Sequence, residues 1–286
     1  MTIREITEKI LAYHPDIPNY NGCDGYKSGD PEQECTGIVC SLVPTIDVIR
    51  RTVELGCNFL YVHEPSYYMT PDFPEWRGSF ENKVYNEKRR LLDEHGIVIF
   101  RDHDHAHAHR PDSIFTGVIK YLGWERYHLP KSPLPFCYLF DLPETTVEAL
   151  NRHLMEKIDM RGTRYIGRPD ARIRRVAIVA HLYPGAFGKE KFENGIYSDY
   201  STALIRLIEE HGVQAIIPGE IIEWNVLSYI ADAAMLGKDV ACLNIGHFNF
   251  EELGAKYAAD WICELCNQKI PVHYVHTGEL WSHQIR

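Results

Sequence analysis

Four histidines occupy alternate positions in residues 97–110, whose sequence is IVIFRDHDHAHAHR: His103, His105, His107 and His109. Histidine is the side chain that most often binds metal ions near neutral pH. In an extended chain, side chains two residues apart share a face and lie roughly 7 Å from each other, so one ion can reach several of them only if the backbone turns. A solvated polar loop is the simpler interpretation of any single histidine. We favour a metal site for the group, because two other stretches have the same form.

The first of these stretches begins with an apolar run, NFLYV at 58–62, which we predict to be a buried strand. His63 and Glu64 follow it at once, and Pro65 prevents the strand from continuing inside a sheet. Both side chains should therefore lie in a turn at the carboxyl end of the strand. The alternatives are a histidine that hydrogen-bonds to the backbone and a carboxylate in solvent.

The other stretch, GHFNFE at 246–251, also follows an apolar run. Apolar residues at helical spacing predict a helix over 248–267: Leu253, Tyr257, Trp261 and Leu265. His247 and Glu251 would then project from one face of its first turn, a spacing that suits two ligands of a metal pair. An equally good interpretation is a histidine–glutamate hydrogen bond at the helix start, where the carboxylate also favours the helix dipole.

The three stretches share their placement at the carboxyl ends of predicted strands, where open α/β sheets bind ligands. Imidazole and carboxylate together suit zinc, iron or manganese. Because the candidates outnumber the ligands that one ion needs, we expect two divalent ions about 3.5–4 Å apart that share a carboxylate and a water. Such a pair lowers the pKa of the bound water and yields a hydroxide nucleophile. The pattern therefore predicts hydrolytic chemistry.

Composition argues against several other classes of protein. The 286 residues are 45% hydrophobic and 24% charged, which is ordinary for a soluble globular protein. A formal net charge of −10 without a basic run argues against nucleic acid as a partner. No apolar run approaches the roughly 18 residues of a membrane helix, and we expect no signal peptide from the charged, amphipathic MTIREITEKI. Eight cysteines then indicate reduced thiols and a cytoplasmic protein; the C-x-x-C pair Cys263 and Cys266 is a weak zinc or redox signal.

Helical and strand patterns alternate along the chain and predict an α/β fold in two similar lobes, each a sheet flanked by helices. The proline-rich residues 129–136, LPKSPLPF, are typical of a linker. We therefore expect an N-terminal lobe over 1–128 and a C-terminal lobe over 129–286. Residues 19–34, rich in Gly, Asp and Asn, predict surface turns, and the polar residues 184–198 predict a loop and a candidate lid.

An eight-residue spacing recurs in the two lobes. It runs from Gly56 to Glu64 and again from Gly212 to Glu220, and each time it spans a helix end, a strand and a carboxylate. This suggests that one α/β unit was duplicated, with Gly219 in the place of the histidine that precedes Glu64. Whether Glu220 has a role at the site stays open.

Several motifs occur in order between about residue 20 and residue 266: GYKSGDP, CSLVPT, LYVHEPSYY, IVIFRDHDHAHAH, IIPGE and CLNIGHFNFE. Together they resemble the Nif-three-like dinuclear-metal-centre family, whose members are often called type-two GTP cyclohydrolase homologues. The resemblance implies a two-lobed α/β fold, a pair of metal ions between the lobes and a hexameric ring of identical subunits. It also implies an activity similar to that of a hydrolase.

Position by position, the resemblance places His63 and Glu64 at two adjacent histidines of the family, His103 and His107 at its histidine and aspartate four residues apart, and His247 and Glu251 at its final His-x-x-x-Glu. It implies as metal ligands His63, Glu64, His107, His247 and Glu251, and whether His103 also binds metal stays open. Two of these depart from the family, which has a histidine in place of Glu64 and an aspartate in place of His107. The two changes are opposite, so the total of imidazoles and carboxylates is preserved. Four extended residues span roughly 13 Å, so His103 and His107 can act together only if the chain turns between them, and we predict a turn there.

The resulting hypothesis is a metal-dependent hydrolase that acts on a small phosphorylated or nucleotide-like molecule and is similar to GTP cyclohydrolase. Glu251 bridges the ions, and His103 or His105 transfers a proton or orients a ligand. The rival is a non-catalytic, ring-shaped scaffold or regulator that binds a metal or metabolite in a closed site. A third hypothesis, the amidohydrolase barrel, is suggested by the H-x-H at 103–105. It needs about eight βα units, and the sequence predicts fewer.

Overall fold

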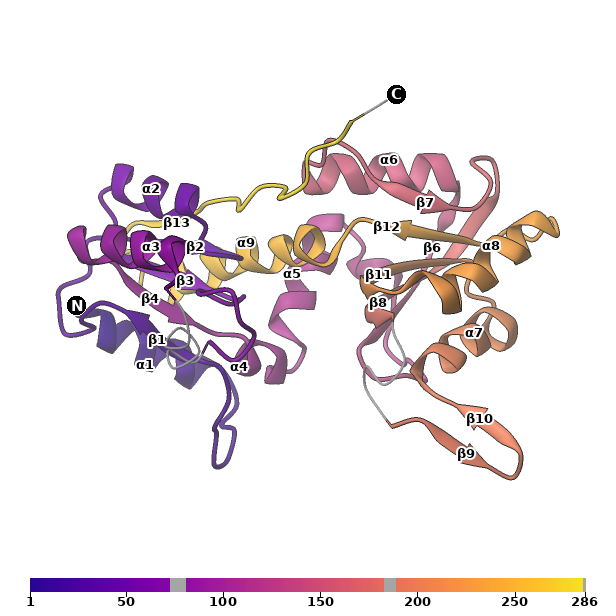
Figure 1. Ribbon diagram of the computed structural model, residues 1–286, viewed down its shortest axis with the longest axis horizontal. Helices are drawn as coiled ribbons and strands as arrows, with labels where there is room; N and C mark the ends of the chain where they lie inside the picture. Colours follow the sequence, from indigo (N-terminus) through magenta and orange to yellow (C-terminus); the bar gives the residue numbers. More distant parts are fainter. Residues whose placement is uncertain (73–80, 183–188, 285–286) are drawn as a thin grey trace. The chain divides into compact units, whose positions relative to one another are not determined.

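The computed structural model describes residues 1–72, 81–182 and 189–284 (Figure 1). Its contacts divide the chain into two compact units. Unit 1 consists of residues 1–118 and 251–278, and unit 2 of residues 119–250 and 279–286. The chain passes from one unit to the other within two helices, α5 (Ser113–Leu122) and α9 (His247–Leu265).

This division differs from the single boundary expected between residues 128 and 129. The proline-rich stretch lies inside unit 2, because β5 (His128–Leu129) pairs with β6 (Cys137–Thr146) on its other side. The chain also returns to unit 1, where α9 contributes apolar side chains to the core and β13 (Val272–Tyr274) joins the sheet. The proline-rich stretch is therefore a connection between paired strands rather than between the two units.

Unit 1 is built on a five-stranded sheet in the order β1-β4-β3-β2-β13. Strands β2 (Ile38–Ser41), β3 (Phe59–Val62) and β4 (Val98–Arg101) run parallel and are connected through α2 (Ile46–Glu54) and α3 (Lys83–Glu94). β1 (Gly25–Ser28) pairs antiparallel with β4, and β13 pairs parallel with β2. The carboxyl ends of β3 and β4 thus emerge side by side.

Side chains of the central strands alternate between two apolar layers, as the two-residue period of a strand requires. Tyr61 and Phe100 belong to a core cluster with α1 (Ile3–Tyr13) and α9. Leu60 and Ile99 belong to a second cluster with α2 and α3, which lie next to each other (Figure 1). A sheet covered on both faces buries its strands completely, which explains their continuous apolar sequences.

Unit 2 is built on a six-stranded sheet in the order β5-β6-β8-β11-β12-β7. Strands β8 (Arg172–Leu182), β11 (Ala215–Ile221) and β12 (Ala241–Asn244) run parallel, whereas β6 and β7 (Arg164–Ile166) are antiparallel to their neighbours. A core cluster joins this sheet to the helical segments α7 (Tyr200–His211), η3 (Glu223–Leu227) and α8 (Ser228–Met235). η2 (Glu125–Tyr127) precedes β5, and α6 (Val147–Ile158) follows β6.

A short hairpin corrects the loop predicted over residues 184–198. Strands β9 (Lys191–Glu193) and β10 (Ile196–Ser198) pair antiparallel, while residues 184–188 lie outside the described part of the chain. Asn194 and Gly195 connect the two strands with positive φ angles of 55° and 77°. An Asn-Gly pair is a strong signal for such a turn, and the polar composition of the stretch concealed it.

The two units repeat one arrangement, as the eight-residue spacing predicts. Each contains three parallel strands in chain order, β2-β3-β4 and β8-β11-β12, connected through helices. Gly56 and Gly212 follow the corresponding helices with positive φ angles of 68° and 66°, which favour glycine. The predicted α/β fold with two similar lobes is confirmed, and two open sheets of five and six strands exclude the amidohydrolase barrel.

Lys88 of α3 is a buried cation. The free energy needed to bury its charge should appear in the pH dependence of stability. The residue is 2% exposed, and Nζ donates a hydrogen bond of 2.5 Å to the carbonyl oxygen of Ser66. Burial lowers the pKa of Lys88 from 10.5 to about 8, against an opposing effect of Asp72. At a pH between these two pKa values, the unfolded chain therefore holds more protons than the folded one.

We expect the free energy of unfolding to rise across this pH window by up to about 3 kcal/mol, since deprotonation relieves the buried charge. The rise should vanish in Lys88→Met. It should remain in Lys83→Met, which removes an exposed lysine from the same helix. Guanidinium denaturation between about pH 7 and pH 10 measures both variants. The same pH dependence in wild type and Lys88→Met would contradict this explanation.

Candidate metal centre

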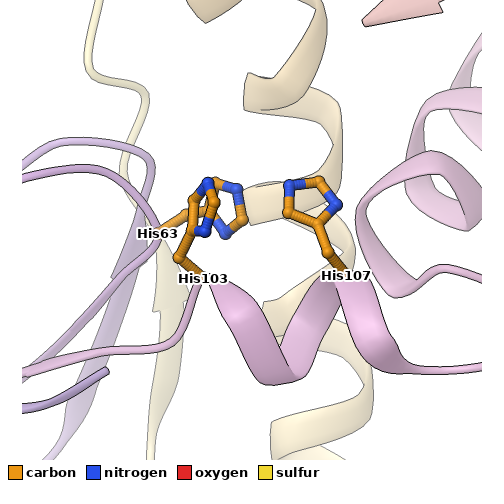
Figure 2. A group of neighbouring side chains, drawn as sticks. All are labelled: His63, His103 and His107. Carbon is orange, nitrogen blue, oxygen red and sulfur yellow. The ribbon is translucent and has the colours of Figure 1, made fainter. Parts of the chain in front are cut away.

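Three histidine rings meet in unit 1 at the carboxyl ends of β3 and β4 (Figure 2). His63 directly follows β3, whereas His103 is the N-cap of α4 (Asp104–Ala108) and His107 lies within it. Ring centroids are 4.6 Å apart for His63 and His103 and 4.9 Å apart for each of the other two pairs. One ring nitrogen of each residue lies within 4.8 Å of the others, so a single cation can be bound by all three.

Each of the three rings is oriented by a hydrogen bond at Nδ1: His63 to the carbonyl oxygen of Asp102 (3.0 Å), His103 to the carboxylate of Asp104 (2.8 Å) and His107 to the carboxylate of Asp112 (2.9 Å). Such bonds select the tautomer that presents Nε2 to a cation. His63 Nε2 is buried and makes no hydrogen bond within the part of the chain that the structure describes. This donor set fits a divalent cation that accepts imidazole, such as zinc, iron or manganese.

Protonation differs among these rings. Burial, with the neighbouring rings of His103 and His107, holds the pKa of His63 well below its usual range, so His63 is neutral and able to bind a cation. Burial also lowers the pKa of His107, but the hydrogen bond to Asp112 and the nearby glutamates outweigh it and raise that pKa to about 9. A proton on His107 therefore competes with a cation at neutral pH.

Two buried glutamates lie beside the histidines. Oε2 of Glu251, on α9, is 3.6 Å from Nε2 of His63, and these two residues form with Glu64 a second group whose ligand atoms lie within 4.8 Å of one another. Glu64 and Glu251 are 7% and 3% exposed, so solvent screens their charges little. The structure thus brings together His63, Glu64, His107 and Glu251 of the ligands expected from the sequence, and it adds His103.

A fully buried arginine holds the carboxylate side of this cluster. Arg101, the last residue of β4, is 1% exposed and lies 3.7 Å from Oε2 of Glu64 and 3.8 Å from the carboxylate of Asp72. Its Nε and Nη1 donate hydrogen bonds to the carbonyl oxygens of His63 and Thr70. One guanidinium therefore ties the segment after β3 to the end of β4 and positions Glu64.

A carboxylate distant in sequence holds the turn that carries the histidines. Asp24 accepts hydrogen bonds from the backbone N–H groups of His103, Asp104 and His105 at 2.7, 3.0 and 2.9 Å. It also bonds to Nδ1 of His105 at 2.7 Å. The N-cap side chain of α4 makes no capping bond of its own, so Asp24 satisfies the N–H groups at the start of this helix. The turn predicted between His103 and His107 is confirmed.

We expect Asp24→Ala to lower the free energy of unfolding by about 2 kcal/mol, because three backbone donors lose a charged acceptor. The affinity for a divalent cation should fall by about tenfold or more, since residues that support metal ligands have effects of this size. Asp30→Ala, which removes an exposed aspartate that caps a nearby turn, is the matched control. Guanidinium denaturation and cation titration of both variants provide the measurement. Equal stability and affinity in the two variants would refute the role of Asp24.

The other two histidines of the segment have partners of their own. His105 bonds to Asp24, as described, and His109 stacks on Tyr13 with ring centroids 4.6 Å apart. Of the two histidines expected to transfer protons, His103 is the one that the structure places in the group with the metal-ligand candidates.

His247 begins α9 and belongs to unit 2, four residues before Glu251. Its Nδ1 lies 2.9 Å from Oε1 of Glu220, and its ring centroid is 5.4 Å from that of His181. Glu220 and His181 are partners in register on β11 and β8. His247 and Glu220 also line a cavity of about 340 Å³ in unit 2, together with Trp281. Glu220, whose role the sequence left open, therefore orients His247.

The internal repeat extends to these residues. In each repeat, the third parallel strand is followed within three residues by a histidine, His103 after β4 and His247 after β12. A second candidate ligand comes four residues later, His107 in the first repeat and Glu251 in the second. The His-x-x-x-His of α4 and the His-x-x-x-Glu of α9 are therefore equivalent positions of the duplicated arrangement.

The residues that hold the ligands in place were not predicted from the sequence. Asp24 lies in a stretch expected to form surface turns, and Arg101 ends an apolar strand. The available signal was the set of aspartates that flank the histidines, Asp102, Asp104 and Asp112. A histidine that binds metal usually donates its other ring nitrogen to a carboxylate or a carbonyl group, and these residues provide the acceptors.

Fold and site together define an α/β protein with a buried histidine–carboxylate cluster at the carboxyl ends of parallel strands. The chain belongs to the Duf34/NIF3 (NGG1p interacting factor 3) family, whose model matches residues 1–186. The family resemblance found in the sequence is thereby confirmed. None of the described helices is long and apolar enough to cross a membrane.

A relative and two solved structures illustrate this membership. The GTP cyclohydrolase 1 type 2 homolog of Clostridium acetobutylicum is 21% identical over 234 residues, which cover 79% of this chain and 76% of the relative. Staphylococcus aureus hypothetical protein SA1388 has the same fold, with a TM-score of 0.69, 17% identity and coverage of 100% of this chain and 99% of the other. The Bacillus cereus protein related to NIF3 gives a TM-score of 0.63 at 12% identity, with coverage of 100% and 99%.

Proposed function

We propose that the protein is a metal-dependent hydrolase with a dinuclear centre that acts on a small phosphorylated or nucleotide-like molecule. One observation carries this proposal: three imidazoles, each with an oriented Nδ1, and two buried glutamates gather at the carboxyl ends of β3 and β4. The proposed ligands are those of the sequence hypothesis, with Glu251 as the bridge: His63, Glu64, His107, His247 and Glu251. His247 precedes Glu251 by one helical turn of α9.

Two divalent cations bound by these residues would supply a hydroxide nucleophile at neutral pH. His103 is suited to orient a ligand at this centre, one of the two roles that the sequence hypothesis gave to His103 or His105. Its Nδ1 is hydrogen-bonded to Asp104, and this bond holds the pKa of Asp104 well below its usual range. Asp104 therefore stays ionised and keeps the ring of His103 oriented within the group that it forms with His63 and His107.

The class of substrate rests on chemistry and on the relative. A cation pair stabilises the negative charge that develops when a phosphate ester or a purine ring is hydrolysed. The Clostridium acetobutylicum relative carries a name that refers to GTP cyclohydrolase, which favours a nucleotide-like substrate. We further propose that the protein works in the cytoplasm as a homo-oligomer, with a hexamer as the expected state.

Metal analysis and a hydrolysis screen test the proposed function. Full-length protein purified without chelator should contain about two divalent ions per chain, and it should hydrolyse nucleotides or phosphate esters only while metal is bound. Metal content below about one ion per three chains would refute the proposal, because these ligands would then not form a metal centre. Full metal content without turnover on any substrate would instead favour the rival scaffold or regulator.

A further inference from the structure

We propose that the two cation positions are unequal, so that the first divalent cation binds to His63, His103 and His107, while Arg101 makes the Glu64 side of the cluster the weaker position. This inference deepens the proposed function and rests on it, because it says how the same site takes up its ions. It also gives His103 a role as a ligand, which the sequence hypothesis left open.

The three histidines already have the arrangement that one cation requires. Their rings form a nearly equilateral triangle, with centroids 4.6, 4.9 and 4.9 Å apart. Each Nδ1 has an acceptor, so all three rings offer Nε2 without rearrangement (Figure 2). Three histidines with one position left for water or substrate form a well-known type of catalytic zinc site. A cation therefore gains three imidazole ligands here at little cost in side-chain order.

The carboxylate side of the cluster already has a permanent positive charge. Arg101 is buried, and its guanidinium lies 3.7 Å from the carboxylate of Glu64 and 3.8 Å from that of Asp72. A guanidinium stays protonated in proteins, so this charge persists at any working pH. A cation bound at Glu64 must therefore share that carboxylate with Arg101 and be repelled by it, with little solvent to screen the repulsion. Occupation of this position should require a higher concentration of metal.

A neighbouring group of potential ligands shows why proximity alone does not make a site. Asp24, Asp102 and His105 also bring ligand atoms within 4.8 Å of one another. The oxygens of Asp24 accept three backbone N–H groups and bond to the ring of His105, so this carboxylate is occupied as a helix cap. Nε2 of His63, by contrast, makes no hydrogen bond within the described residues, and its ring lies against those of His103 and His107. The group of Asp24, Asp102 and His105 therefore supports α4, whereas the three-histidine group is where a cation is expected.

Titration with Co²⁺ of the full chain, stripped of metal with a chelator, tests the order of binding. Equilibrium dialysis counts the ions, and the visible spectrum of bound Co²⁺ reports its coordination. The first equivalent should bind at least about tenfold more tightly than the second, since repulsion by a buried charge has effects of this size. Its spectrum should be that of a four- or five-coordinate ion with nitrogen ligands.

Three variants separate the two positions. His103→Asn should weaken the first equivalent by about a hundredfold or more, beyond what loss of a supporting residue causes. Glu64→Gln should weaken the second equivalent and leave the affinity of the first within about threefold of wild type. His95→Asn, which removes an exposed histidine at the end of α3, should change neither equivalent.

His103→Cys distinguishes a ligand from a residue that merely supports the fold. A cysteine thiolate at this position keeps a metal-binding atom, so tight binding should be retained and a thiolate-to-cobalt charge-transfer band should appear in the near ultraviolet. Two equivalents of equal affinity would overturn the inference and leave the proposed dinuclear centre standing. Unchanged first-equivalent binding in His103→Asn, or loss of that equivalent in Glu64→Gln, would overturn it as well. Failure of wild type to bind Co²⁺ would overturn the proposed function together with the inference.

Discussion

His63→Ala should reduce metal-dependent hydrolysis by at least about a thousandfold, because without a bound cation no hydroxide nucleophile forms at neutral pH. His63 has the largest expected effect since it belongs to both groups of ligand atoms, one with His103 and His107 and one with the two glutamates. Its loss removes a neutral ligand from either position. Metal content after purification should fall together with turnover.

Two controls separate a direct effect of His63→Ala on metal binding from a loss of structure. His63 is buried, so circular dichroism and the oligomeric state of the variant must be compared with wild type. His95→Ala, at the exposed C-cap of α3, controls for loss of an imidazole in general. An intact His63→Ala variant that keeps wild-type metal content and turnover would remove the basis for a metal centre at the end of β3.

Arg101→Met should lower the free energy of unfolding of the metal-free protein by about 3–5 kcal/mol, as expected when one partner of a buried ion pair is removed. Methionine fills much of the space of the arginine stem but provides no charge. Glu64 and Asp72 would remain buried without their counter-charge, and the carbonyl oxygens of His63 and Thr70 would lose a donor.

Arg175→Met in unit 2 is the matched control. Arg175 also bonds to a carboxylate through two nitrogens, at 2.8 and 2.9 Å from the oxygens of Asp141, but both side chains are partly exposed. Exposed pairs contribute less than about 1 kcal/mol, so this variant should change stability little. Guanidinium denaturation of both metal-free variants measures their free energies of unfolding. Similar small losses in the two variants would mean that Arg101 is not needed to balance the buried carboxylates.

The central strands of the fold were predictable because a strand buried on both faces has a continuous apolar sequence. The runs NFLYV and IVIF became β3 and β4 for this reason. β1 has the sequence GYKS, which carries no such signal, and it is a strand because it pairs with β4. The return of the chain to unit 1 was not predictable either, since α9 and β13 are placed by contacts with residues more than 150 positions earlier, such as Ile38.

At the candidate site, the sequence indicated which residues could bind metal but not how they are supported. His63 and Glu64 could be placed because a proline follows them at the end of a strand. The alternation of histidines from 103 to 109 favours an extended chain, and the helical turn found there depends on hydrogen bonds to Asp24, 79 residues before His103. Arg101 looks in sequence like the polar end of a strand. Its burial depends on two carboxylates from a different segment.

The division of unit 1 into two chain segments has a consequence for biosynthesis. Until residue 251 has left the ribosome, the nascent chain lacks Glu251, most of α9 and the edge strand β13. The apolar residues of β2, β3 and β4 that pack against α9 are then covered on that side by α1 alone. Unit 2, apart from its last residues, is by then complete and free to fold first. A nonsense mutation near codon 250 should therefore yield an aggregation-prone, chaperone-dependent fragment rather than a half-functional protein.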